Sequence, residues 1–214
     1  MSKPSAVLLC PGRGSYTKAE LGFVGRTIRP GPVAEALEAA DAARQRDERP
    51  TFSSLDGAEK FRPSQHLDGE NAAALIYFGT MAHVEQLRER YNILAVAGNS
   101  LGWYTALPAS GALDAASGWR LVSSMAALQQ QVKGGQVLTT TVGEDWRPDA
   151  ALRAAVDTTL QGLRDRGHDY FCDYSIRLGG HQVLAGTEAA TRELLTLLPK
   201  ISIGEREFPF RLAG

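Results

Sequence analysis

The pentapeptide Gly98-Asn99-Ser100-Leu101-Gly102 constrains this chain most, because a short apolar run, residues 93–97, comes directly before it and a helical pattern follows. A strand, a glycine-flanked serine and a helix in this order predict a sharp turn that strains the backbone at the serine. The glycines allow the strand and the helix to approach closely, and the amides that begin the helix favour negative charge on the serine oxygen. Ser100 is therefore a candidate nucleophile. The alternative is a glycine-rich turn in which the serine only caps the helix.

Short apolar runs and helical patterns alternate through the first part of the chain. The run over residues 6–10, halted by Pro11 and Gly12, and the run over 93–97 predict two buried parallel strands of an α/β sheet. The polar stretch over 49–69 is broken by proline and glycine and is predicted to be a loop. Helices are predicted over 32–46, over 71–90 and over 103–133, the last with interruptions at Pro108, Gly111 and Gly118.

A different pattern begins after Gly134 and Gly135. Strand-like and helical segments follow one another in the order β-α-β-β-α-β, which is the ferredoxin-like order. These segments are residues 136–142, 149–166, 170–176, 182–184, 187–198 and 208–212. The sequence therefore predicts an α/β body over 1–135 and a small ferredoxin-like subdomain over 136–214.

Composition excludes several classes of partner. The 214 residues carry 23 Lys and Arg against 24 Asp and Glu, so the sequence indicates no basic surface for nucleic acid or anionic lipid. No segment approaches the roughly 20 apolar residues that span a bilayer, and none is typical of a signal peptide, so we expect a cytoplasmic protein without a membrane partner. Cys10 and Cys172 lie far apart in apolar stretches, which predicts buried thiols and no metal site.

Three blocks of sequence resemble the malonyl-CoA:acyl-carrier-protein transacylase family. They are residues 11–15 (PGRGS), 95–104 (AVAGNSLGWY) and 110–113 (SGAL), which are similar to the PGQGSQ, VAGHSLGEY and AGAL blocks of the family. The resemblance implies an α/β-hydrolase-like parallel-sheet body with an inserted ferredoxin-like subdomain. It also implies a serine acyltransferase that moves an acyl group from acyl-CoA, through an ester on Ser100, to the phosphopantetheine thiol of an acyl carrier protein. Acyl-CoA is then a substrate, and no permanently bound cofactor is expected.

The resemblance also implies roles for other residues. The backbone N–H groups of Leu101 and of Arg13, which replaces a glutamine of the family, are expected to bind the oxyanion of the reacting thioester. The alternative for the Arg13 side chain is a solvated cation of the loop. Asn71 stands where the family has a glutamine that lines the pocket, and its alternative role is to cap a helix. Asn99 and Trp103 replace a histidine and a glutamate, and are expected to reshape the acyl pocket.

Met125 occupies the position at which the family has an arginine that pairs with the malonyl carboxylate. Because methionine offers a carboxylate no donor, we expect a non-carboxylated acyl group to be preferred and malonyl to be a poor substrate. The alternative is that Arg120 or Arg13 supplies the positive charge, although Arg120 lies on a different helical face from Met125.

Members of the family have a histidine that takes the serine proton, and the matching blocks of this chain contain no such residue. In the family it lies in a motif like GAFHSPLM, and this chain ends at Gly214, at the threshold of that segment. We therefore expect a chain without the C-terminal third of the family, whose histidine lies beyond Gly214 or is absent. His181, after a glycine turn, is the best substitute among the histidines of the chain. His83 sits among apolar residues of a helix, His66 lies in the polar loop and His168 opens a strand.

Two other functions follow from the same residues. An acyl-thioester hydrolase uses the same serine and passes the acyl group to water. A chain without a base is a catalytically inactive module that binds coenzyme A or carrier protein. A sheet edge left by missing strands would be open to pairing with a second chain.

Overall fold

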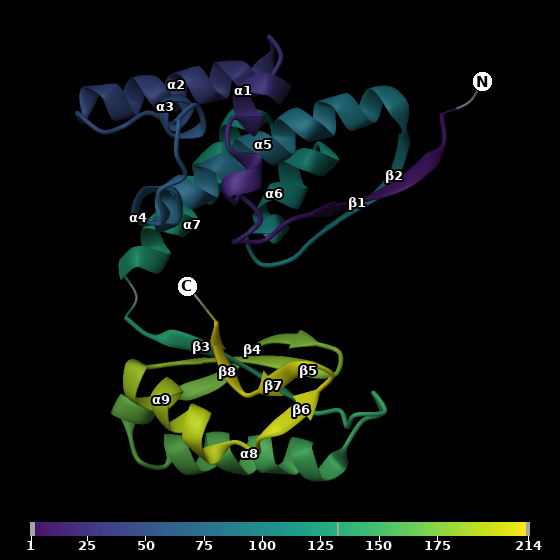
Figure 1. Cartoon of the computed structure of the whole chain (residues 1–214), viewed down its shortest axis with the longest axis vertical. Coiled ribbons are helices and arrows are strands. Elements are labelled where there is room, and N and C mark those ends of the chain that lie inside the picture. The colour runs from purple at the N-terminus through teal and green to yellow at the C-terminus, as the bar shows by residue number, and fades with distance from the viewer. Residues whose placement is uncertain (1–2, 132, 213–214) are drawn as a thin grey trace. The chain divides into compact units, whose positions relative to one another are not determined.

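The computed structural model describes residues 3–131 and 133–212. The chain divides into two compact units, Met1–Gln131 and Val132–Gly214, whose elements are labelled in Figure 1. Gly135, predicted to end the first domain, instead begins strand β3 (Gly135–Thr140), because its backbone pairs with Gly186 of the second unit.

Within residues 3–131, the described elements of the first unit are two parallel strands with helices between and after them. In chain order they are β1 (Ser5–Cys10), the short 3-10 helix η1 (Lys18–Glu20), α1 (Phe23–Thr27), α2 (Pro32–Arg46), α3 (Phe52–Asp56), α4 (Pro63–His66), α5 (Gly69–Arg90), β2 (Asn92–Gly98), α6 (Leu101–Ser110) and α7 (Ala115–Gln131).

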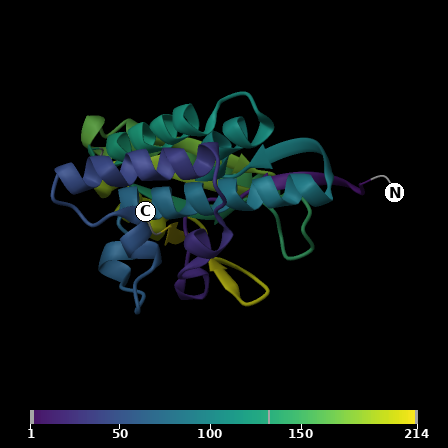
Figure 2. The same ribbon diagram turned by 90° about the horizontal axis from the view of Figure 1, so that it is seen from above.

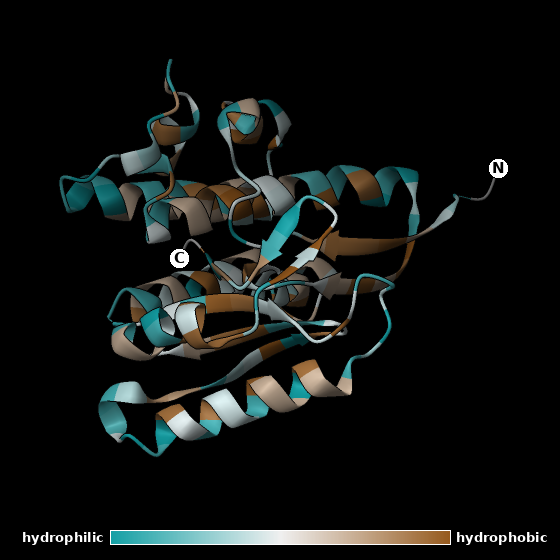
Figure 3. Cartoon of the chain, turned by 60° about the horizontal axis from the view of Figure 1, so that its bottom comes forward, coloured by the Kyte–Doolittle hydropathy of each residue, from teal (hydrophilic) through white to brown (hydrophobic). Residues whose placement is uncertain are grey.

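The two apolar runs form a parallel pair, β1 and β2, as predicted. Leu8 and Cys10 point into the helical core and are buried. The second face of the sheet is not buried, since Val7, Leu9 and Leu94 are 59%, 76% and 67% exposed. Figure 3 shows β1 as a brown, apolar strand that leads in from the N-terminus. The prediction of two buried strands is therefore wrong for this face, because no described residue of the first unit covers it.

Helix α5 lies at the centre of the first unit's core, and its prediction over 71–90 is confirmed. It packs against α2 and α7, and Figure 2 shows α2 and α5 alongside each other. Ala73 and Ala74 are fully buried and allow this close packing. Tyr77 is also fully buried, and its hydroxyl donates to the carbonyl of Ala115 over 2.6 Å.

The stretch 49–69 is not a loop throughout, because it contains α3 and α4. The Thr51 hydroxyl caps α3, and the Asp41 carboxylate accepts from the Phe52 amide over 2.7 Å. The Phe52 ring is almost completely buried and anchors this short helix in the core. Pro63 begins α4, and His66, at its end, is fully buried. Contacts with residues far away in the sequence therefore stabilise α3 and α4.

The helical region after Ser100 is broken at only one of the three predicted positions. Gly111 ends α6 in a left-handed conformation, with φ of 86°. Pro108 lies inside α6 and Gly118 lies inside α7. An added Cβ at Gly118 would lie 2.6 Å from the Pro108 ring. This glycine therefore allows two helices to approach closely and does not interrupt one.

The second unit contains an antiparallel sheet in the order β4-β5-β3-β8. Side chains of the sheet, among them Val137 and Leu184, form a core with residues of α8 and α9. The elements after β3 are α8 (Ala150–Arg164), the 3-10 helix η2 (His168–Tyr170), β4 (Cys172–Leu178), β5 (His181–Gly186), α9 (Glu188–Leu197), β6 (Ile201–Ile203), β7 (Arg206–Phe208) and β8 (Phe210–Leu212).

Two features of this unit differ from the predicted order. A hairpin of β6 and β7 stands between α9 and β8, so the predicted strand over 208–212 is divided between β7 and β8. His168 lies in η2 and does not open a strand, which begins at Cys172.

Over residues 3–131 and 133–212, no helix combines the length and the apolar character that crossing a bilayer requires.

Candidate active site

Ser100 stands at the junction of β2 and α6 with φ of 55° and ψ of −121°. Residues other than glycine rarely adopt a positive φ, and they hold it only where the surrounding structure enforces it. The side chain is exposed and makes no capping hydrogen bond with α6. The predicted strained turn is therefore present, and the serine does not act as a cap.

Three glycines explain how the turn is enforced. A Cβ on Gly98 would lie 2.1 Å from the carbonyl oxygen of Gly102, and a Cβ on Gly102 would lie 2.1 Å from the carbonyl oxygen of Cys10. A Cβ on Gly12 would lie 2.9 Å from the Asn99 carbonyl oxygen and 3.1 Å from the Ser100 Cβ. No larger residue fits at these positions. The loop after β1 and the turn at Ser100 are therefore in direct contact.

The backbone donors around Ser100 fall into two groups. The Gly102 amide donates to the Asn99 carbonyl over 2.9 Å, and the Trp103 amide donates to the Ser100 carbonyl over 3.0 Å. The amides of Leu101 and Arg13 donate to no acceptor among the residues that the structure describes. An oxyanion site requires donors that the protein itself leaves unsatisfied, and these two amides meet that condition.

A small pocket brings together four of the predicted site residues: Arg13, Ser100, Leu101 and Met125. Its volume of about 10 Å³ is room for about one water molecule. An acyl group would therefore occupy it only after side chains such as that of Met125, which is flexible, move aside.

Tyr104 and Gln129 also line this pocket and were not predicted as site residues. Tyr104 lies three positions after Leu101 on α6, and Gln129 lies four positions after Met125 on α7. The i, i+3 and i, i+4 spacings, which place two side chains on one helical face, were the signal that would have found both.

Asn71, Asn99 and Trp103 do not line this pocket. The Asn71 amide nitrogen donates to the carbonyl of Gln65 over 2.8 Å, and its oxygen is buried with no partner among the described residues. Asn71 also does not cap α5, which begins at Gly69. Asn99 is exposed, and Trp103 is exposed on α6.

Arg13 and Arg120, the two candidate cations, differ in their positions. Arg120 is exposed and donates to the Ser117 hydroxyl over 3.0 Å, away from the pocket. Arg13 is half-buried in the pocket, and burial lowers the pKa of its guanidinium group. No described residue forms a salt bridge or a side-chain hydrogen bond with Arg13. Of the two, only Arg13 stands beside Ser100.

The histidines of the first unit lie outside the pocket of Ser100. His66 is enclosed by backbone, with its Nε2 donating to the Leu55 carbonyl over 2.9 Å and its Nδ1 accepting from the Arg62 amide over 3.0 Å. His83 faces the ring of Phe23 edge-on, with centroids 5.8 Å apart. His66 therefore has a structural role, whereas His83 is exposed and lies outside the pocket of Ser100.

The histidines of the second unit differ in exposure. His168 is exposed in η2. The His181 ring stacks on Phe208 at 4.9 Å and meets Trp146 edge-on at 5.6 Å. Its Nδ1 is buried without a partner among the described residues.

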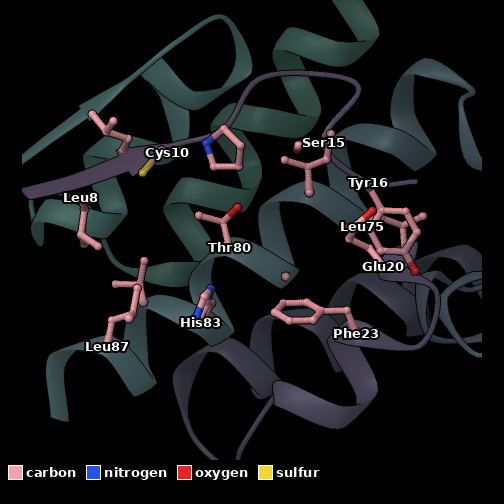
Figure 4. A pocket seen from close by; sticks show the side chains of 15 residues that line it. Leu8, Cys10, Ser15, Tyr16, Glu20, Phe23, Leu75, Thr80, His83 and Leu87 are labelled. Carbon is pink, nitrogen blue, oxygen red and sulfur yellow. The ribbon is translucent and has the colours of Figure 1, made fainter. Parts of the chain in front are cut away.

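A second, larger pocket lies between β1, α1 and α5 and has a volume of about 280 Å³. Figure 4 shows Leu8 and Cys10 of β1 on one side, and Thr80, His83 and Leu87 of α5 on another. Ser100 is not part of its lining, and most of the lining is apolar.

In the part of the chain that the structure describes, no group of three His, Cys, Asp or Glu side chains is placed to hold a metal ion. Cys10 and Cys172 are both buried and unpaired, as predicted.

The observed architecture is mixed α/β, and comparison with solved structures makes the fold more specific. The malonyl-CoA:ACP transacylase of Synechocystis sp. PCC 6803 matches 99% of this chain with a TM-score of 0.66 and 19% identity. FabD from Acinetobacter baumannii matches 99% of it with a TM-score of 0.68 and 17% identity. A type II PKS acyl-carrier protein in complex with its malonyl-transacylase matches 91%, with a TM-score of 0.63 and 18% identity.

The chain therefore has the fold of malonyl-CoA:ACP transacylases, which confirms the resemblance found in the sequence. It spans 63%, 62% and 58% of the lengths of these three structures. No protein-family model matches the chain, and no curated protein matches it in sequence.

Proposed function

We propose that this chain is the serine-bearing part of an acyltransferase that moves an acyl group from acyl-CoA to the phosphopantetheine thiol of an acyl carrier protein. The observation that carries the proposal is Ser100, held at positive φ between β2 and α6 with its hydroxyl free of the helix. This arrangement is a nucleophile elbow. The likeness in fold to transacylases supports the reaction class, and the matched complex that contains a carrier protein supports the partner.

The proposal includes the finer fold assignment. The parallel pair β1 and β2 with its helices is the α/β-hydrolase-like body. The sheet order β4-β5-β3-β8 with α8 and α9 supports a ferredoxin-like subdomain inserted into that body.

The chemistry at Ser100 is an exchange of a thioester for an ester. The Ser100 oxygen forms a bond to the thioester carbonyl carbon, the bond from that carbon to sulfur breaks, and the serine proton ends on the sulfur of coenzyme A. The amides of Leu101 and Arg13 bind the carbonyl oxygen while it carries negative charge. The carrier-protein thiol then takes the acyl group and returns the proton to Ser100. No bound cofactor takes part.

The acyl group in this proposal has no carboxylate. Met125 lies in the pocket with Ser100 and offers no hydrogen-bond donor, so a malonyl carboxylate placed against its side chain would lose water there without gaining a partner from Met125. Arg13, which lines the same pocket, is the one charged group there that could pair with a carboxylate instead.

A second candidate is a module that binds acyl-CoA or carrier protein without turnover. One observation favours it: no histidine of residues 3–131 lines the pocket of Ser100. An unassisted serine hydroxyl is a weak nucleophile.

The test is to incubate the chain with acetyl-CoA or malonyl-CoA and to measure its intact mass. We expect an acetyl adduct that Ser100→Ala abolishes. The matched control Ser110→Ala, at an exposed serine at the C-terminal end of α6, should keep the adduct. A carrier protein should then remove it. A malonyl adduct that forms faster than the acetyl adduct contradicts the acyl preference. Free acid released without carrier protein indicates a hydrolase, and no adduct with carrier binding retained indicates the module.

A further inference from the structure

We infer that the guanidinium group of Arg13, and not only its amide, stabilises the negative charge that develops on the thioester oxygen at Ser100. This inference rests on the proposed function. It assigns a charged catalytic side chain to a pocket whose expected donors are backbone amides.

The first observation is position. Arg13 follows Gly12, whose backbone touches the Asn99 carbonyl and the Ser100 Cβ. Arg13 lines the same small pocket as Ser100 and Leu101. The pocket is narrow enough that any group bound there lies close to all three residues.

The second observation is the charge balance of the pocket. Arg13 is its only charged lining residue among those described, and its other lining residues are apolar or neutral. A half-buried cation has lost part of its hydration, and this loss is normally offset by a carboxylate or by hydrogen-bond acceptors. The described residues offer Arg13 neither.

A half-buried guanidinium without an acceptor favours the binding of an anion in the pocket. In the proposed reaction, the anion formed at Ser100 is the tetrahedral oxyanion, which exists only during the transfer. An interaction that strengthens only in the transition state raises the turnover rate and leaves substrate affinity largely unchanged. The partial burial of Arg13 strengthens that interaction relative to bulk water.

Arg13 could instead bind a carboxylate on the acyl group or a phosphate of coenzyme A, and each of these alternatives predicts a different result when Arg13 is replaced. If Arg13 pairs with a carboxylate on the acyl group, its loss affects malonyl-CoA only. If it pairs with a phosphate of coenzyme A, its loss raises KM for every acyl-CoA and leaves an uncharged reagent unaffected.

The experiment compares the wild type with Arg13→Gln, Arg13→Lys and the matched control Arg120→Gln. Rates of Ser100 acylation are measured with acetyl-CoA and with malonyl-CoA. A third probe is an uncharged alkyl fluorophosphonate. It forms a bond from the Ser100 oxygen to phosphorus and releases hydrogen fluoride, and its phosphoryl oxygen takes the place of the oxyanion.

We expect Arg13→Gln to lower the maximal rate with acetyl-CoA and the rate of fluorophosphonate labelling by about 10- to 100-fold. KM for acetyl-CoA should change by less than about twofold. The rates of Arg13→Lys, which keeps the charge, should lie between those of the wild type and Arg13→Gln. The rates of Arg120→Gln should equal those of the wild type. The thermal unfolding midpoint should not change in either Arg13 variant, because Arg13 has no described partner to lose.

Three results would overturn the inference: unchanged rates in Arg13→Gln, a loss confined to malonyl-CoA, or a rise in KM without an effect on fluorophosphonate labelling. If the fluorophosphonate labels the wild type but no acyl-CoA acylates it, the proposed function is refuted. The rates of fluorophosphonate labelling in the wild type and the Arg13 variants then still test the role of Arg13. A wild type that no probe labels refutes both.

Discussion

Replacing Gly102 by alanine tests how tightly β1 holds the turn at Ser100. The added Cβ would lie 2.1 Å from the carbonyl oxygen of Cys10, 2.7 Å from its carbon and 2.9 Å from the carbonyl oxygen of Pro11. These atoms belong to the backbone of a paired strand and the loop that follows it, so no side-chain rotation relieves the clash.

The magnitude follows from these distances. The shortest contact falls about 1.3 Å short of the 3.4 Å at which ordinary contact begins, so the loop after β1 must move away from α6. Overpacking costs about 1–3 kcal/mol even where side chains adjust, so we expect a loss of at least about 3 kcal/mol in the free energy of unfolding. We also expect acylation of Ser100 to be lost, because the amide of Arg13 moves with the loop.

The assay is urea unfolding followed by circular dichroism and tryptophan fluorescence. Gly25→Ala in the same unit is the matched control, because its Cβ would meet only the Asp56 carboxylate at the ordinary distance of 3.5 Å. The control should unfold within about 1 kcal/mol of the wild type. A Gly102→Ala variant within about 0.5 kcal/mol of the wild type would refute the reasoning, since ordinary surface substitutions have effects of that size.

Two further predictions concern titratable groups. Burial, and then the hydrogen bond that its hydroxyl donates to Asp56 over 2.6 Å, raise the pKa of Tyr16 above its ordinary value of 10.0. As the pH rises, the unfolded chain therefore loses this proton before the folded chain does, and the free energy of unfolding declines above about pH 10. In urea titrations at a series of pH values, Tyr16→Phe should make that decline less steep. Burial also raises the pKa of the thiols of Cys10 and Cys172. Both should react with a thiol reagent such as dithionitrobenzoate only as the protein unfolds, and rapid reaction in the native state would contradict their burial.

The turn at Ser100 could be predicted from sequence because the pattern that marks it is local. A strand, two glycines and a helix within one short segment indicate the turn, and the structure shows the expected positive φ. The pairing of β1 with β2 was likewise readable, since both runs are apolar and helices separate them. The contact of Gly12 with this turn joins segments far apart in the chain, and the spacing of glycines alone does not reveal it.

The parts that could not be predicted depend on distant contacts. Helix α3 forms in a polar stretch because Asp41 accepts from the amide of Phe52 and the core encloses the Phe52 ring. The exposed face of β1 was missed for the same reason, since the apolar character of Leu9 says nothing about what lies over it. Asn71 was assigned to the pocket by its place in the chain, but its amide turns to Gln65.

The fit between the Gly12 loop and the turn at Ser100 has a consequence for protein engineering. Because Gly12, Gly98 and Gly102 are each packed against the backbone of the other segment or of the turn itself, the pentapeptide does not carry its own geometry. Grafting it onto another scaffold would reproduce the motif without the reactive conformation. The transplantable module is the pentapeptide together with the strand end and loop of residues 8–14.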